Sequence, residues 1–270
     1  MRNNRLFSNS ITPENPSGKK MGLTMLLVWL AWFYANLGAN GLFYKALNGT
    51  PALRLPGEIA YFLGVSIVGI VAAYHFARKW NLDLPLFPKK RGISFWIGSL
   101  VFLGLVIVLG FQAMAEQNMT MADVLKQPFI WIIAPFPIFV PTMIAYTLLW
   151  YVFFLRGFEK LLGGSKAATA AAIILSAIVY GIYHSASIDE ILTIEQMIDE
   201  IVITTLIGIG FGLYVIFARS LVIAFFVNWI LNWFVFTPVA TFHRPIREWL
   251  LPYVVLGGVW LVYRYWWSEK

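Results

Sequence analysis

The chain has 270 residues, of which 60% are apolar and 17% aromatic, while only 12% carry a charge. Its mean hydropathy of +0.73 excludes a water-soluble domain, because its apolar runs reach the about 20 residues that a helix needs to cross a bilayer. The formal net charge of +7 fits loops at anionic lipid headgroups, so nucleic-acid binding is not expected. The absence of cysteine excludes disulfides, thiol catalysis and thiolate metal sites.

The apolar runs predict an all-α membrane protein, a polytopic bundle of about eight transmembrane helices. A polar tail, residues 1–20, precedes a single transmembrane domain that takes up residues 21–270. The tail has no apolar stretch, so it is not expected to be a signal peptide. The expected spans are 21–44, 57–77, 93–114, 137–156, 167–187, 201–218, 221–240 and 249–267.

The distribution of Lys and Arg predicts the orientation. With a cytoplasmic N-terminus, fifteen of the 20 basic residues fall on the cytoplasmic side. The opposite side keeps five, namely Lys45, Arg54, Lys126, Arg244 and Arg247. Both termini are therefore expected to be cytoplasmic. The expected location is the cytoplasmic membrane of a prokaryote.

Local patterns refine three of these elements. Three prolines break the long apolar run that starts at Pro128, so 128–136 is predicted to be a re-entrant or interfacial piece and the fourth span to start near Pro137. Apolar residues in 189–200 recur at helical spacing, which predicts an amphipathic helix on the outer surface. Gly208 and Gly212 lie one helical turn apart, a spacing that lets a neighbouring backbone approach closely.

Three polar patterns fall on the predicted helices in a fixed order. The fourth span ends in Tyr151-Val-Phe-Phe-Leu-Arg156-Gly-Phe158. The fifth ends in Tyr180-Gly-Ile-Tyr-His184, and its spacing places Tyr180 and His184 on one helical face. The seventh follows Ser220-Leu221 and carries Asn228 and Asn232, whose amides also share a face.

This order resembles the CPBP family, the CAAX-protease and bacteriocin-processing intramembrane proteins. Arg156, His184 and Asn232 match polar positions of the family's motifs, which implies a family-like core at about 137–240. Tyr151 and Val152 stand where the family has two glutamates, and Asn228 stands where it has a histidine.

The resemblance implies that the first glutamate is the general base of a protease. A base must be ionised near neutral pH, whereas an ordinary tyrosine of pKa about 10 is deprotonated at about one part in a thousand, and valine has no proton to exchange. The leading hypothesis is therefore a catalytically degenerate CPBP-like protein. It would act as a scaffold, assembly or immunity factor that binds a membrane protein or a lipid-like ligand, with no cofactor or metal.

Two other functions remain open at this point. An active intramembrane endopeptidase could use a displaced base, and Glu159, Asp189 and Glu190 are the carboxylates near the motif helices. A small transporter or transporter subunit would need matching broken helices in two halves of the chain, and the proline-broken start of the fourth span has no such counterpart.

Overall fold

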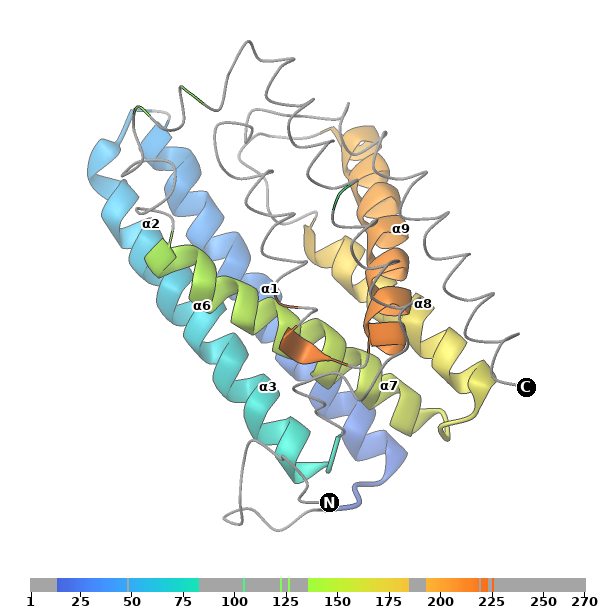
Figure 1. Cartoon of the computed structure of the whole chain (residues 1–270). Helices are drawn as coiled ribbons and strands as arrows, with labels where there is room; N and C mark the ends of the chain where they lie inside the picture. The colour runs from blue at the N-terminus through green and yellow to red at the C-terminus, as the bar shows by residue number, and fades with distance from the viewer. Residues whose placement is uncertain are drawn as a thin grey trace.

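A computed structural model describes residues 14–47, 49–82, 136–184, 193–218 and 220–222, together with the single positions 104, 122, 126 and 225. Within these residues every regular element is helical (Figure 1). The predicted span 249–267 lies outside the described residues, as do the predicted spans 93–114 and 221–240 and the predicted re-entrant piece 128–136 apart from positions 104, 136, 221, 222 and 225.

The N-terminal part of the described chain is a helical hairpin. Helix α1 (Gly18–Leu47) leads through the short turn η1 (Pro51–Leu53) into α2 (Arg54–Ala60), η2 (Tyr61–Ile67) and α3 (Val68–Lys79). The last three segments follow one another without a break, and η2 is a wider π-helical segment. The backbone N–H of Glu14 donates to the Lys79 carbonyl oxygen over 2.7 Å, so α1 begins beside the end of α3.

The next described rod is also continuous. It consists of α6 (Phe136–Tyr146), the π-helix η4 (Thr147–Phe154) and α7 (Leu155–Leu161). Phe136 is its first described residue, and the predicted fourth span, which starts near Pro137, falls within this rod. Pro141 lies inside α6 and supplies no backbone N–H, and a wider helical turn follows a few residues later.

Helices α8 (Lys166–His184) and α9 (Ile194–Ala218) form a second hairpin. Before it, Gly163 and Gly164 turn the chain from α7 with φ angles of +93° and +70°, which glycine adopts without steric cost. The sequence predicts a separate surface helix up to residue 200, but α9 is one helix from Ile194. No proline interrupts its hydrogen-bond ladder, and apolar helical periodicity alone does not tell a surface turn from the start of a span.

Close packing between α8 and α9 depends on glycine. A Cβ atom added to Gly208 would lie 3.2 Å from Ala177, and one added to Gly212 would lie 3.0 Å from Ile173. The predicted close approach at these two glycines is confirmed, and the neighbour is α8. Since lower numbers on α8 pair with higher numbers on α9, the two helices are antiparallel.

Four described helices are long and apolar enough to cross a membrane, by length and composition: Gly18–Ala39, Tyr61–Lys79, Val140–Leu161 and Lys166–His184. These segments correspond to the first, second, fourth and fifth predicted spans, and they are the features of a helical membrane protein. In the most apolar stretch of Val140–Leu161, 72% of the residues are buried, compared with 22–39% in the other three. The rod that carries Tyr151, Val152 and Arg156 is therefore the innermost of the four.

Candidate functional site

His184 is the last residue of α8, and aromatic rings surround it. Its ring centroid lies 4.3 Å from that of Tyr180, one turn earlier, in an edge-on arrangement. The predicted placement of these two side chains on one helical face is confirmed. The rings of Tyr183 and Tyr146 lie 5.7 Å and 6.1 Å from the imidazole. Its Nε2 atom is buried, and the ring contacts described for the imidazole all come from tyrosines.

Tyr183 connects His184 to a buried aromatic cluster, formed by Trp32, Tyr146, Trp150 and Tyr183. The indole of Trp32 stacks on Tyr183 with centroids 4.3 Å apart and planes 13° apart. Trp150 meets Tyr183 edge-on at 5.4 Å, and the Tyr146 hydroxyl donates to the Tyr183 hydroxyl over 3.3 Å. The cluster joins α1, the α6–η4 rod and α8, so it fixes the position of the helix end that carries His184.

Trp32 is the centre of this aromatic cluster and is only 1% exposed. Its Nε1–H donates to the Val65 carbonyl oxygen over 2.6 Å. Val65 lies in the π-helical segment η2. In a π-helix the backbone hydrogen bonds of the α-helix are shifted by one residue, which can leave a carbonyl oxygen accessible to a side-chain donor. Gly69 leaves the necessary space, because a Cβ there would come within 2.8 Å of the Trp32 nitrogen.

The two positions where the family motif has glutamates lie inside η4, and both are buried. Tyr151 is 7% exposed and Val152 1% exposed. The ring of Tyr151 packs against Phe211 of α9 with centroids 6.5 Å apart. Both side chains therefore belong to the hydrophobic core, an environment in which an ionised carboxylate would lack hydration.

Trp150, directly before these two positions, has a buried indole N–H. Its side chain is 2% exposed, and its Nε1–H finds no acceptor among the described residues. A buried N–H without an acceptor is costly, so this donor marks a place where a water molecule or a ligand oxygen would be stabilised.

Arg156 lies in a separate polar group, the Arg156–Glu159–Thr169 network. The Arg156 guanidinium contacts a Glu159 carboxylate oxygen at 2.5 Å, and the Thr169 hydroxyl donates to the other oxygen over 2.6 Å. The arginine and glutamate side chains are 16% and 20% exposed. The network ties α7 to the first turn of α8.

The structure does not bring Arg156 and His184 together. Thr169 and His184 occupy opposite ends of α8, fifteen residues apart, which corresponds to about 22 Å along a helix axis. Glu159, one of the predicted displaced bases, lies with Arg156 at the far end. Asp189 and Glu190 lie outside the described residues.

The third motif is described only at its start. Ser220 and Leu221 are 1% and 7% exposed, so the turn after α9 is packed into the protein. Asn228 and Asn232 lie outside the described residues. Within the residues that the structure describes, no three His, Asp or Glu side chains gather in a way that could hold a metal ion.

The two tryptophans of the aromatic cluster, Trp32 and Trp150, are not among the site residues predicted from the sequence. A signal was present, because tryptophan in membrane helices is enriched at the water interface, whereas Trp32 and Trp150 fall well inside their predicted spans. A large amphipathic ring at mid-span indicates a buried contact between helices.

Comparison with protein families agrees with the order of the motifs. The family described as type II CAAX prenyl endopeptidase Rce1-like matches residues 126–234. This segment of the chain is Rce1-like. The Rce1-like segment contains the α6–η4–α7 rod, α8 and α9, and therefore Tyr151, Val152, Arg156 and His184. No curated protein and no solved structure matches the chain.

Proposed function

We propose that this CAAX-protease-related membrane protein has lost proteolysis and uses its helices to hold a membrane protein or a lipid-like ligand, as a scaffold, assembly or immunity factor. The observation that supports this function is the composition of the region around His184. Its described ring contacts come from tyrosines, and the two glutamate positions of the motif are tyrosine and valine inside the core. Peptide-bond hydrolysis needs a base within hydrogen-bond reach of water, and these side chains do not supply one.

The arrangement of Glu159 also supports the proposal. One carboxylate oxygen accepts from Arg156 and the other from Thr169. These two hydrogen bonds stabilise the ionised carboxylate and occupy both of its oxygens. Its partner Thr169 lies about 22 Å along α8 from His184. A protease with Glu159 as its displaced base would have to bring the two ends of α8 together.

The buried N–H of Trp150 suggests what the protein holds instead. The Trp150 ring meets Tyr183 edge-on, and its N–H supplies a donor that an amide or ester carbonyl oxygen would satisfy. Peptide bonds of a transmembrane partner and ester groups of a lipid both carry such oxygens.

The test has two arms on the purified full-length protein. In the first, a prenylated peptide is incubated with the wild type, with His184→Ala and with Glu159→Gln, and cleavage is followed by mass spectrometry. We expect no product with any of the three. Product that disappears in His184→Ala would overturn the proposal, and loss in Glu159→Gln alone would favour the displaced base.

In the second arm, the chain is extracted gently from its own membrane and the bound molecules are identified by mass spectrometry. A membrane protein or lipid retained in fixed stoichiometry is expected. A Trp150→Phe variant keeps an aromatic side chain, although a smaller one, and removes the donor, so retention of the bound molecule should fall. Unchanged retention would remove Trp150 from the site, and recovery of the bare chain would contradict the holding function.

We further propose that the end of the bundle where α1 begins faces the cytoplasm. Seven of the described basic residues gather there, Lys19, Lys20, Arg78, Lys79, Arg156, Lys160 and Lys166, while Lys45 and Arg54 lie at the other end. The chain has no cysteine, so Lys19→Cys and Lys45→Cys each introduce a single reactive thiol. In intact cells an impermeant thiol reagent should label Lys45→Cys only; the reverse pattern would invert the orientation.

A further inference from the structure

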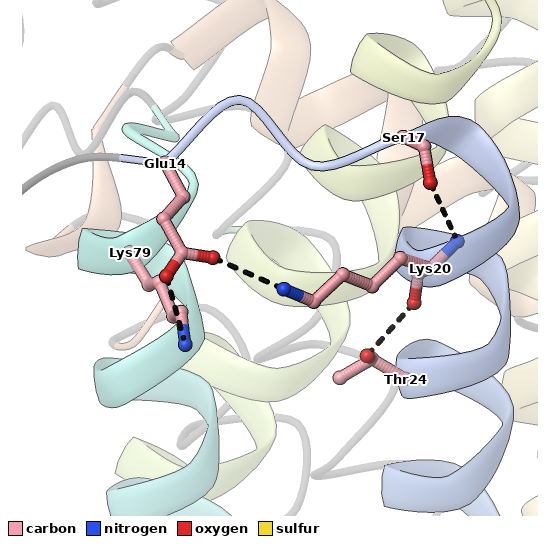
Figure 2. A network of polar contacts seen from close by, with 5 residues as sticks. All are labelled: Glu14, Ser17, Lys20, Thr24 and Lys79. Carbon is pink, nitrogen blue, oxygen red and sulfur yellow. Dashed lines mark hydrogen bonds and ion pairs between the residues drawn. The ribbon is translucent and has the colours of Figure 1, made fainter.

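The N-terminal segment before α1 places a carboxylate between two lysines from different helices. Figure 2 shows Glu14 directed toward Lys20 of α1 on one side and Lys79 at the end of α3 on the other. The two ammonium groups lie 3.4 Å and 3.3 Å from different oxygens of this one carboxylate. The Glu14 backbone N–H also donates to the Lys79 carbonyl oxygen. The two lysines thus form a small anion site in which each ammonium group binds one oxygen, and the Glu14 carboxylate occupies it.

The surroundings of this two-lysine site are basic. Lys19 is exposed directly beside Lys20, and Arg78 precedes Lys79 and donates to the Tyr74 hydroxyl over 3.0 Å. The N-terminus of α1, with Ser17 accepting from the Lys20 backbone N–H, adds the positive end of a helix dipole. Glu14 pairs with Lys20 and Lys79, and the basic residues next to these two lysines in sequence add further positive charge, so the site retains a net attraction for a further anion.

The position of the site determines which anions reach it. It lies where two candidate membrane spans end, Gly18–Ala39 at its first residue and Tyr61–Lys79 at its last. The ends of membrane spans lie at the level of the lipid headgroups. There the most abundant anion is the phosphodiester of a phospholipid, which carries one negative charge and two free oxygens, as a carboxylate does.

We propose that Lys20 and Lys79 form a binding site for the phosphodiester of an anionic phospholipid, and that Glu14 occupies this site internally when no such lipid is bound. Glu14 lies before the first residue of α1 and its side chain is 44% exposed, so its carboxylate can leave the two lysines without a change in either helix. Lys20 is 63% exposed and Lys79 28% exposed, so both are accessible from the headgroup layer. Release of Glu14 exposes both ammonium groups to the lipid.

The test measures lipid retention by native mass spectrometry of the full chain, purified in a zwitterionic detergent and titrated with phosphatidylglycerol. Glu14→Gln removes the competing charge, and we expect roughly fivefold tighter retention. Lys20→Gln and Lys79→Gln should each weaken it roughly fivefold, the effect of one basic residue near an anionic membrane surface. Lys45→Gln at the other end of α1 is the matched control and should leave retention unchanged.

Two further titrations identify the source of the phosphate. Phosphatidylcholine, whose choline charge offsets the phosphate, should be retained weakly and equally by all variants. Inorganic phosphate at millimolar concentration should not displace phosphatidylglycerol.

Equal retention of phosphatidylglycerol by Glu14→Gln, Lys20→Gln and Lys45→Gln would overturn the proposal, as would weaker retention by Glu14→Gln. Displacement by inorganic phosphate would assign the site to a soluble anion and would also overturn it. Lys20→Gln changes an exposed side chain, so it keeps the test decisive if Lys79→Gln does not fold.

Discussion

At the end of the bundle where α1 begins, ion pairs connect neighbouring helices in addition to apolar contacts such as the stacked rings of Trp80 and Phe153. At the end where α8 stops, the described contacts between helices are mainly aromatic rings and close glycine contacts. The first end has the Glu14 contacts, the Arg156–Glu159–Thr169 network and Lys160, which donates to the Trp80 carbonyl oxygen over 2.6 Å. The second end has the aromatic cluster and Gly181, where α8 meets α9.

This difference separates two kinds of stability. Charge pairs near a surface contribute modestly and respond to salt and pH. Buried rings and close backbone contacts stabilise the protein through buried apolar area and dense packing. Their contribution therefore changes with side-chain volume and not with pH. The aromatic cluster beside His184 belongs to the second kind.

The largest expected effect is at the centre of the aromatic cluster. Trp32→Ala removes a fully buried ring and the hydrogen bond to Val65, and it should lower the free energy of unfolding by about 3–5 kcal/mol. Thermal unfolding in detergent, followed by tryptophan fluorescence, measures the loss. Trp32→Phe keeps the stacking on Tyr183 but not the donor, and it should lose less. Equal losses in both variants would assign the effect to the hydrogen bond.

A smaller effect is expected where α8 approaches α9. A Cβ atom on Gly181 would overlap the Thr205 hydroxyl and come within 2.7 Å of the Ile201 carbonyl oxygen. Gly181→Ala should therefore push the helices apart and cost about 1–3 kcal/mol. Gly38→Ala on α1 is the matched control, since a Cβ there meets nothing within 4 Å, and it should be neutral or slightly stabilising. A neutral Gly181→Ala would contradict the close approach.

At the charged end, the Arg156–Glu159 pair is mostly shielded from solvent, so it should be worth more than a fully exposed pair. We expect a coupling energy of about 1–2 kcal/mol from a double-mutant cycle of Arg156→Ala and Glu159→Ala. Thermal unfolding at low and high salt measures this coupling energy, and 1 M salt should reduce the coupling energy only partly. A coupling energy near zero would mean that the Arg156–Glu159 pair stabilises the protein no more than an exposed ion pair does.

The smallest effect concerns Glu14 and depends on pH. Partial desolvation raises the pKa of the Glu14 carboxyl, but the hydrogen bonds and charges of Lys79 and Lys20 outweigh it and hold that pKa below its ordinary value. The stabilisation is therefore present above the ordinary glutamate pKa of about 4.3 and is lost as the pH falls through the lower folded value. The melting temperatures of wild type and Glu14→Gln should differ slightly at pH 7 and converge below that value. A difference that persists at the lowest pH would contradict this assignment.

The sequence predicted local features well. Apolar runs indicated the four candidate spans, and helical spacing placed Tyr180 beside His184 and a close neighbour at Gly208 and Gly212. These features depend on residues within a few turns of one another, so local periodicity determines them. The separate surface helix before α9 was not found, because the same periodicity fits both arrangements.

What the sequence by itself determined is that the chain is apolar enough to cross a membrane, and that its motifs lack the two glutamates and one histidine of the family they resemble. Only the tertiary structure decided which of these motif positions come together. It keeps Arg156 with Glu159 at one end of α8 and His184 at the other, and it places Trp32, distant in sequence, against Tyr183. The physical reason is that helix spacing fixes which residues share a face, whereas the depth and register of one helix against another depend on packing across the whole bundle.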